Sequence, residues 1–260
     1  MNKLKRCRYG TMVYPANDLY IGRSLDLYGE FSEGEVALFR RIVKPGDTVL
    51  DIGANIGAHT VPLAQLAGRT GHVVAFEPQG ILYYCLCGNV VMNNLNNVDC
   101  RPAAAGAAAG LLAVPELDYD AEQNFGGLDL RHEYTGLATY NVPVTPIDDL
   151  GLQRCNLIKV DVEGMEKEVL QGAAATIRQC KPILYVEDDR PDRSAELRKL
   201  IRDLDYVVYQ HRPAYFNPAN LANNQENVFP NIASFNLFCH PRGGTAPADP
   251  DEFRMARVDH

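Results

Sequence analysis

"VLDIGANIGAHT", residues 49–60, is the stretch that decides the fold of this chain. An apolar strand ends at Asp51, a turn carries Gly53 and Gly57, and a helical stretch follows. Strand, glycine turn and helix in this order are typical of the first unit of a nucleotide-binding α/β sheet. A dinucleotide-binding turn has a further glycine where this chain has Asn55, because the backbone there approaches a pyrophosphate. The turn therefore predicts a nucleoside ligand without a pyrophosphate, and the chain lacks the Gly-Lys-Ser/Thr of a P-loop.

A second acid follows the next strand, "VVAFEP", where Glu77 lies twenty residues beyond Gly57. An acid at this position can accept hydrogen bonds from both ribose hydroxyls of an adenosine, and Asp51 can face a cationic group. Taken singly, either acid can be a helix cap or a surface residue. Adenosine, no phosphate and a positive charge together predict S-adenosylmethionine. The predicted cofactor-binding residues in these two motifs are Asp51, Gly53, Asn55, Gly57 and Glu77.

Composition excludes several other classes of protein. The 260 residues are 46% hydrophobic and 22% charged, which is ordinary for a globular chain with one core. A net charge of -8 disfavours a nucleic-acid partner. No apolar run approaches the roughly 20 residues that span a bilayer, and the basic start lacks the apolar core of a signal peptide. Seven scattered cysteines form no metal-type pair of pairs, so we expect free thiols and a cytoplasmic location.

The rest of the chain alternates strands with helices. We expect helices at about 58–67, 79–94, 165–178 and 192–204, between apolar strands. This rhythm predicts an α/β fold, a mostly parallel sheet with helices on both faces. One domain should cover residues 1–241, followed by a flexible tail at 242–260.

The N-terminal segment, residues 1–45, should pack on that domain as an extension. A hairpin is expected at residues 7–22, around turn-forming residues in "YPAND". A helix is expected after Ser32, because Glu35 three residues later completes a capping-box pattern.

Charged residues concentrate in "LIKVDVEGMEKEVLQGA", residues 157–173. Lys159, Asp161 and Glu163 alternate with apolar residues along a strand, and Glu166 follows at the start of a helix. In an open α/β sheet, ligands bind outside the carboxyl ends of the strands. Asp161 and Glu163 should therefore face the ligand cavity. The structural alternative is a salt-bridged strand end with acids at a helix N-terminus, which we prefer for Glu166.

These motifs resemble the FkbM family of S-adenosylmethionine-dependent methyltransferases. "DIGANIGAHT", "AFEP", "VTPIDDL", "KVDVEGMEKEVLQGA" and "PILYVE" match its motifs in order, over roughly residues 28–187. The resemblance implies a Rossmann-like class I methyltransferase fold, with seven strands of which the last is antiparallel. It also implies methyl transfer, often to a hydroxyl of a sugar or secondary metabolite, without fixing the acceptor. His59 and Pro146 depart from the usual residues of the family.

A hydroxyl is a weak nucleophile, so an enzyme of this kind must align it and help remove its proton. Glu163 is the first candidate base. Asp161 would orient the acceptor or the sulfonium side of the cofactor, and Lys159 would pair with both acids. His211, at another strand end, is the alternative base because its ordinary pKa suits proton removal at neutral pH.

The remaining polar motifs leave alternatives open. "EDDR", residues 187–190, could bind a divalent cation together with Asp161, but a solvated turn is the simpler reading and we expect no metal. Asp148 can be a helix cap or an acid at the rim of the cavity.

Two long loops, 117–136 and 212–231, resemble lids over the site. The segment "DLYGEF", residues 26–31, could close over the cofactor from the N-terminal side. Aromatic residues of the two loops suit stacking on a sugar-like acceptor; they are Tyr119, Phe125, Tyr215 and Phe216.

The leading hypothesis is thus an O-methyltransferase for a small hydroxylated acceptor, without nucleic-acid or membrane partners. The alternatives are an N- or carboxyl-methyltransferase acting on a peptide or small molecule, and a cofactor-binding module without turnover. A NAD-linked dehydrogenase is opposed by Asn55 in the glycine turn. The sequence does not indicate an oligomeric state.

Overall fold

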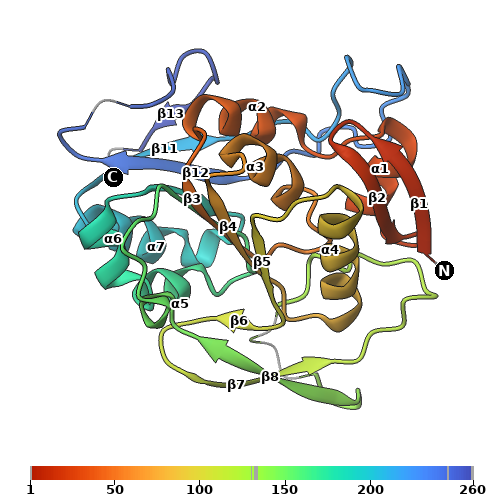
Figure 1. Cartoon of the computed structure of the whole chain (residues 1–260), viewed down its shortest axis with the longest axis horizontal. Helices are drawn as coiled ribbons and strands as arrows, with labels where there is room; N and C mark the ends of the chain where they lie inside the picture. Colours follow the sequence, from red (N-terminus) through yellow and green to blue (C-terminus); the bar gives the residue numbers. More distant parts are fainter. Residues whose placement is uncertain (1, 130, 132–133, 245, 259–260) are drawn as a thin grey trace.

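A computed structural model describes residues 2–129, 131, 134–244 and 246–258. Within these residues the main sheet has eight strands in the order β13-β11-β12-β10-β9-β3-β4-β5 (Figure 1). All neighbours from β10 to β5 are parallel, whereas β12 is antiparallel to both β10 and β11. The bounds are β3 Thr48–Ile52, β4 His72–Phe76, β5 Val98–Arg101, β9 Leu157–Val160, β10 Ile183–Glu187, β11 Tyr206–His211, β12 Asn236–Pro241 and β13 Ala256–Arg257.

This topology confirms the mostly parallel sheet in which the last long strand, β12, is reversed. The predicted number of seven strands is corrected by β13, a two-residue strand that pairs with the edge of β11. Those two residues belong to the tail that we expected to be flexible. Residues 245, 259 and 260 of that tail lie outside the described part of the chain.

Helices cover both faces of the sheet (Figure 1). Apolar residues of α2 and α3 share a buried cluster with Val49 and Leu157, whereas those of α5, α6 and α7 pack with Leu50 and Ile158. Neighbouring residues of one strand thus face opposite layers, as the two-residue period of a strand requires. The helices are α2 Glu33–Ile42, α3 Thr60–Ala67, α4 Gly80–Met92, α5 Glu166–Gln171, α6 Ala174–Cys180 and α7 Pro191–Asp203.

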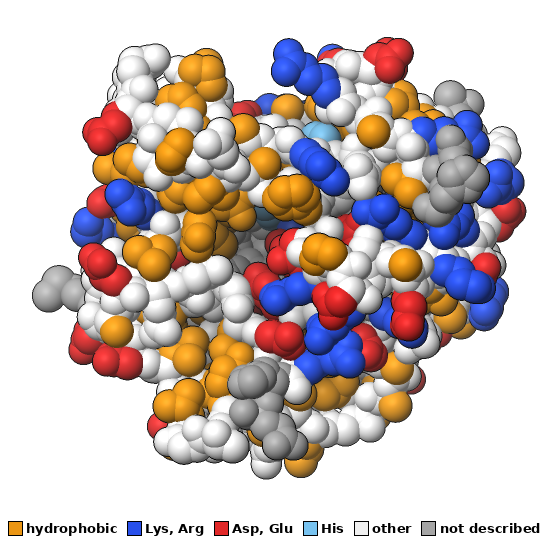
Figure 2. Space-filling model, turned by 180° about the vertical axis from the view of Figure 1, so that it is seen from behind, with side chains coloured by type: hydrophobic (Ala, Val, Ile, Leu, Met, Phe, Trp, Pro, Cys, Tyr) orange, Lys and Arg blue, Asp and Glu red, His pale blue; other side chains and the backbone are white. Residues whose placement is uncertain are grey.

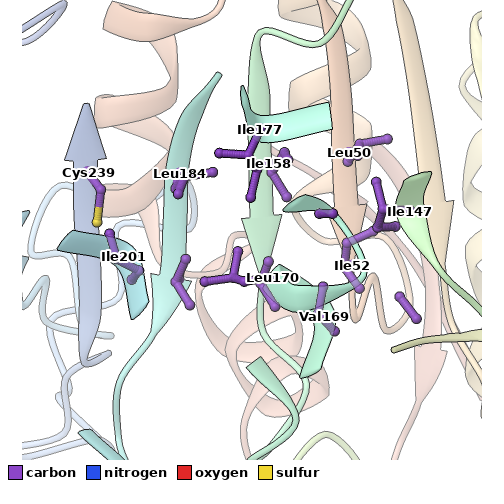
Figure 3. Close-up of a cluster of buried hydrophobic side chains, with 14 of the residues drawn as sticks. Leu50, Ile52, Ile147, Ile158, Val169, Leu170, Ile177, Leu184, Ile201 and Cys239 are labelled. Atoms are coloured by element: carbon purple, nitrogen blue, oxygen red, sulfur yellow. The ribbon is translucent and has the colours of Figure 1, made fainter. Parts of the chain in front are cut away.

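The larger core cluster fixes the register of the central strands (Figure 3). Leu50, Ile158 and Leu184 lie side by side on β3, β9 and β10, and all three are fully buried. The same register pairs Asp51 of β3 with Lys159 of β9 at the next position. Packing of the core therefore places these two charged side chains beside each other near the carboxyl ends of the strands.

The helix predicted at 165–178 is in fact two helices, α5 and α6, with a break at Gly172. The carbonyl of Gly172 accepts a hydrogen bond from the backbone N–H of Asp148 (2.8 Å). The carboxylate of Asp148 in turn accepts the N–H groups of Ala175 and Thr176 at 2.9 and 2.8 Å. Asp148 is therefore the cap of α6, which decides between the two roles considered for it.

The N-terminal hairpin is displaced from its predicted position. It pairs β1, Asn2–Cys7, with β2, Gly10–Pro15, and α1, Ile21–Tyr28, follows as a helix that the sequence reading missed. The helix predicted after Ser32 is α2. However, the Ser32 hydroxyl donates to the Glu35 carboxylate at 2.9 Å and does not cap a backbone N–H, so the capping box is wrong in detail.

A small second sheet lies below the main one in Figure 1, in the order β6-β8-β7. Its bounds are β6 Ala104–Ala105, β7 Gly110–Pro115 and β8 Thr139–Thr145, and a 3-10 turn at Ile147–Leu150 follows. The strand β8 runs into the "VTPIDDL" motif, residues 144–150, and belongs to this sheet. No helix in the described ranges is both long and apolar enough to cross a membrane.

We expect Asp148→Ala to lower the free energy of unfolding by about 1 kcal/mol, because α6 loses its N-terminal cap. Asp149→Ala is the matched control, since Asp149 is exposed and adjacent. Urea unfolding followed by circular dichroism would measure both. Equal free energies of unfolding for the two variants would contradict the capping role.

Candidate functional site

The carboxyl ends of β3, β4, β9 and β10 border a cavity of about 500 Å³. Figure 2 shows a hollow on one face of the molecule, with charged side chains along one side and hydrophobic ones along the other. Acidic groups outnumber basic ones in the described lining of the cavity. The acids are Glu35, Glu77, Asp161, Glu163, Glu187 and Asp189, and the bases are Lys159 and Arg190.

The glycine turn is shaped by three residues with left-handed backbone, Gly53 (φ 79°), Asn55 (φ 51°) and Gly57 (φ 82°). A Cβ atom on Gly53 would lie 1.7 Å from the carbonyl oxygen of Asp161. Only glycine therefore allows the end of β3 to approach the end of β9 this closely. The turn lines the cavity through Gly53, Ala54 and Asn55.

Glu77 is only 3% exposed and lines the cavity beside the turn. Its Oε2 atom accepts the backbone N–H of Asn55 and its Oε1 atom accepts that of Gln79, both at 2.8 Å. Each carboxylate oxygen retains a second lone pair, so the group can still accept hydrogen bonds from a diol. Burial raises the pKa of Glu77 to about 7. This placement fits the predicted ribose contact.

Asp51 lies beneath the cavity and does not line it, which corrects the expectation that its carboxylate faces the ligand. One oxygen accepts the Thr60 hydroxyl at 2.7 Å, and the other is 3.2 Å from Lys159 Nζ. Lys159 also lies 3.4 Å from Asp161 Oδ2. Burial alone would lower the pKa of Lys159, but the two carboxylates outweigh it and raise this pKa. Lys159 thus pairs with Asp161 as predicted, but its shorter contact is with Asp51. The predicted pairing with Glu163 is wrong, because Glu163 pairs with Arg190.

Three carboxylates converge where β9 and β10 end. Oxygens of Asp161, Glu163 and Glu187 lie within 4.8 Å of one another. Arg190 Nη2 donates to Glu163 Oε2 at 2.6 Å and holds this side chain in place. Burial, together with the charges of Asp161 and Asp189, raises the pKa of Glu163 to about 8. The arrangement brings Glu187 and Asp161 together as the cation hypothesis required, and the expected absence of a metal stays a prediction.

Two other predicted residues support the site from outside the cavity. Glu166 accepts the backbone N–H of Gly164 at 2.9 Å and so stabilises the loop after β9. His211 is buried, and its Nδ1 atom lies 2.9 Å from the Tyr185 hydroxyl. Burial also lowers the pKa of His211. Because His211 does not line the cavity, the structure corrects its proposed role as the base.

Of the four aromatic residues expected to stack on an acceptor, only Tyr215 lines the cavity. Phe125 is fully buried and stacks on Tyr119, with ring centroids 4.5 Å apart. Phe216 packs on the helix α1. Phe31, from the segment expected to close over the cofactor, does line the cavity. Residues 130, 132 and 133 of the first loop lie outside the described part of the chain.

Sequence reasoning missed two buried polar residues of the cavity, Glu35 and His59. The sequence patterns assign Glu35 only to a helix cap, and they mark His59 only as a departure from the usual residue of the family. The available signal was the position of Glu35 on the apolar face of α2, beside Val36 and Phe39. A charged residue on the buried face of a helix indicates a function or a buried partner.

Residues 51–208 match the family model of the methyltransferase FkbM domain, which is more than half of the chain. The chain belongs to the FkbM methyltransferase family. Among curated relatives, it is 30% identical to methyltransferase sdnD of Sordaria araneosa over 156 residues, 48% of this chain and 59% of that protein. It is 26% identical to the hexuronic acid methyltransferase AglP of Haloferax volcanii over 204 residues, 72% of this chain and 80% of that protein.

Solved structures show the same fold. The methyltransferase FkbM of Methylobacillus flagellatus aligns with a TM-score of 0.51 at 18% identity, over 79% of this chain and 50% of that one. A precorrin-6y C5,15-methyltransferase of Geobacter metallireducens aligns with a TM-score of 0.50 at 12% identity, over 79% and 87%. This FkbM chain thus spans only about half of the first structure and 59% of sdnD.

The raised pKa of Glu77 makes the ligand-free protein less stable as the pH rises. The folded state keeps a proton on Glu77 up to a pKa of about 7, above its ordinary 4.5, so stability falls across this window by up to about 3 kcal/mol. The Glu77→Gln variant has no titrating group at this position. Its free energy of unfolding should therefore rise relative to that of the wild type between pH 4.5 and 7. Urea unfolding at several pH values measures this difference.

The exposed Glu116 supplies the control, since Glu116→Gln should follow the wild-type curve at every pH. Parallel curves for Glu77→Gln and the wild type would show that Glu77 is ionised normally in the folded state.

Proposed function

We propose that this FkbM-family chain transfers a methyl group from S-adenosylmethionine to a hydroxyl group of a small molecule, a sugar or a secondary metabolite. The observation that carries the proposal is the buried Glu77 carboxylate, which is fixed by two backbone N–H groups and opens on an acid-lined cavity next to a glycine turn without a pyrophosphate cradle. When bound, S-adenosylmethionine supplies an electrophilic methyl group on a positively charged sulfur.

The residues present fit this donor. Glu77 can accept the two ribose hydroxyls, as an acid at this strand end does in other nucleoside-binding sheets. The excess of carboxylates in the lining suits a ligand that carries positive charge. Gly53 and Asn55 provide the close backbone approach of the turn.

The acceptor should lie against the ends of β9 and β10. There Asp161 and Glu163 can hold a hydroxyl by hydrogen bonds and take its proton, while Arg190 keeps Glu163 oriented. Because the pKa of Glu163 is about 8, this carboxyl becomes a base only as the pH approaches and passes 8. The rings of Phe31 and Tyr215 supply an apolar wall for the face of a sugar.

The charge of this wall favours a neutral acceptor. Asp161, Glu163, Glu187 and Asp189 face the cavity. Among the described lining residues their cations are Arg190 and Lys159, and Lys159 is shared with the buried Asp51. A carboxylate-bearing acceptor would be repelled unless it displaced Arg190 from Glu163. The relative named as a hexuronic acid methyltransferase supports the sugar class, and we propose an uncharged hydroxyl compound for this chain.

The same excess of acids also suits an ammonium group, so methylation of an amine is the second candidate. An ammonium group must first lose a proton to a carboxylate or to water before its nitrogen can attack. It gives up this proton far more readily than a hydroxyl does, so an N-methyltransferase would depend less on Glu163. All seven cysteines are free, which supports our proposal that the chain works in a reducing cytoplasm.

The test is transfer of labelled methyl from S-adenosylmethionine to a panel of monosaccharides, hydroxylated metabolites and amines. We expect labelling of a hydroxyl compound, with kcat/KM that rises as the pH approaches 8. Glu163→Gln should lower kcat by about 100-fold or more and abolish this pH dependence, because the base is lost. Its affinity for S-adenosylhomocysteine should stay within about threefold of the wild type, since the nucleoside contacts are untouched.

Glu196→Gln is the matched control for this change, because Glu196 is a largely exposed carboxylate outside the cavity. Labelling of amines alone, with kcat unaffected by Glu163→Gln, would contradict O-methylation and favour the second candidate.

A further inference from the structure

A carboxylate at one end of the cavity has no cationic partner. Glu35 is 3% exposed and lines the cavity from α2. The hydroxyls of Ser32 and Ser234 both donate to its Oε1 atom. No Lys or Arg side chain of the described ranges lies within 4.0 Å of Glu35, and the nearby Lys159 is paired with Asp51 and Asp161. An ionised carboxylate without a partner is costly here, and burial raises the pKa of Glu35. A cationic ligand would stabilise the ionised form.

His59 provides a second unused group next to Glu35. Its ring is 6% exposed and is held by contacts with Phe31 and Phe39, with ring centroids 5.6 Å away in each case. The Nε2 atom is buried, has no hydrogen-bond partner among the described residues and lies 3.7 Å from Glu35 Oε2. Burial lowers the pKa of His59 to about 4, so the ring is neutral at physiological pH.

The chemistry of the pair selects its ligand. A carboxylate oxygen accepts hydrogen bonds only, and a neutral imidazole offers one acceptor nitrogen. With the ring proton on Nδ1, Glu35 Oε2 and His59 Nε2 are two acceptors 3.7 Å apart, and His59 Nε2 has no hydrogen-bond partner among the described residues. An ammonium group satisfies both, since it carries three N–H donors and the positive charge that Glu35 lacks.

We propose that Glu35 and His59 bind the α-ammonium group of the methyl donor. This assignment rests on the proposed function, because S-adenosylmethionine carries this group at its amino-acid end. Glu77 bonds to the first half of the glycine turn through Asn55, whereas His59 follows its last glycine, Gly57. The two polar sites therefore flank the same turn, one for the nucleoside and one for the amino-acid end.

The assignment also explains why Asp51 is sealed beneath the cavity. Its carboxylate is fully buried against Thr60 and Lys159 and does not line the cavity, so a ligand ammonium group does not reach it. We therefore assign the ammonium contact to Glu35 and not to Asp51. Glu35 lies on α2, which precedes the part of the chain that matches the FkbM domain, residues 51–208. Donor recognition by this chain then depends on its N-terminal segment as well as on the family domain.

The test is calorimetric titration of the full chain with two ligands, S-adenosylhomocysteine and its analogue without the α-amino group. For the wild type we expect the analogue to bind at least about tenfold more weakly, as for loss of a charged hydrogen bond. Glu35→Gln should weaken S-adenosylhomocysteine by at least about tenfold and change the affinity for the analogue by less than about threefold. His59→Phe keeps the aromatic packing. It should also weaken S-adenosylhomocysteine more than the analogue, but by a smaller factor than Glu35→Gln.

Glu33→Gln is the matched control, since Glu33 is on the same helix and does not line the cavity. It should leave both affinities unchanged. Equal weakening of both ligands by Glu35→Gln would indicate a structural role, and no weakening of either would indicate another ammonium site; both results overturn the proposal. If Glu35→Gln fails to fold, equal affinities of the wild type for the two ligands would still refute it. A wild type that binds neither ligand would instead overturn the proposed function.

Discussion

The buried contact between Lys159 and Asp51 is the interaction on which the rest of this site depends. It joins β3 to β9 at the second-to-last residue of each strand. Asp161 adds a second, longer contact to the same ammonium group. The apolar register one residue earlier, Leu50 beside Ile158, places the two charges opposite each other. Because the Asp51 carboxylate pairs with Lys159, the turn that follows offers its backbone to a ligand in the cavity. Gly53 allows this turn to approach the carbonyl of Asp161 closely.

The remaining acids are left with too few cations. Lys159 and Arg190 serve Asp51, Asp161, Glu163 and Asp189, whereas Glu35 and Glu77 are held only by neutral donors. Burial raises the pKa values of Glu35, Glu77 and Glu163, so that these acids hold their protons to a higher pH and carry less negative charge. A ligand with positive charge and with hydroxyls to donate would remove the imbalance without protonation, which is the physical link between this cavity and an adenosyl sulfonium donor.

Much of the fold could be predicted because its signals are local. The apolar run and glycines of residues 48–57 form β3 and its turn as expected, and the acid at the end of β4, Glu77, lies in the cavity. The break between α5 and α6 could not be predicted, because it depends on Asp148, which is distant in sequence. The displaced hairpin and the extra strand β13 likewise result from pairing partners that local patterns do not reveal.

The site was predicted less completely than the fold, because burial and facing are tertiary properties. Spacing placed Asp51 and His211 at strand ends, but it could not show that one pairs with Lys159 and the other with Tyr185 behind the cavity wall. Glu35 lies on α2 and His59 is the residue before α3, so the two side chains meet only in the folded chain. Asp161 and Glu163 were predicted from strand alternation, but β9 ends at Val160 and both residues lie in the loop that follows it. They line the cavity because the strand ends at its rim.

Calorimetric titration of the wild-type chain with S-adenosylhomocysteine and with NAD tests the central claim most directly, namely that this cavity is built for an adenosyl ligand without a pyrophosphate. We expect saturable one-to-one binding of S-adenosylhomocysteine in the micromolar range and no detectable binding of NAD. Binding of NAD, with an affinity equal to that of S-adenosylhomocysteine or lower, would contradict a glycine turn that lacks a pyrophosphate site.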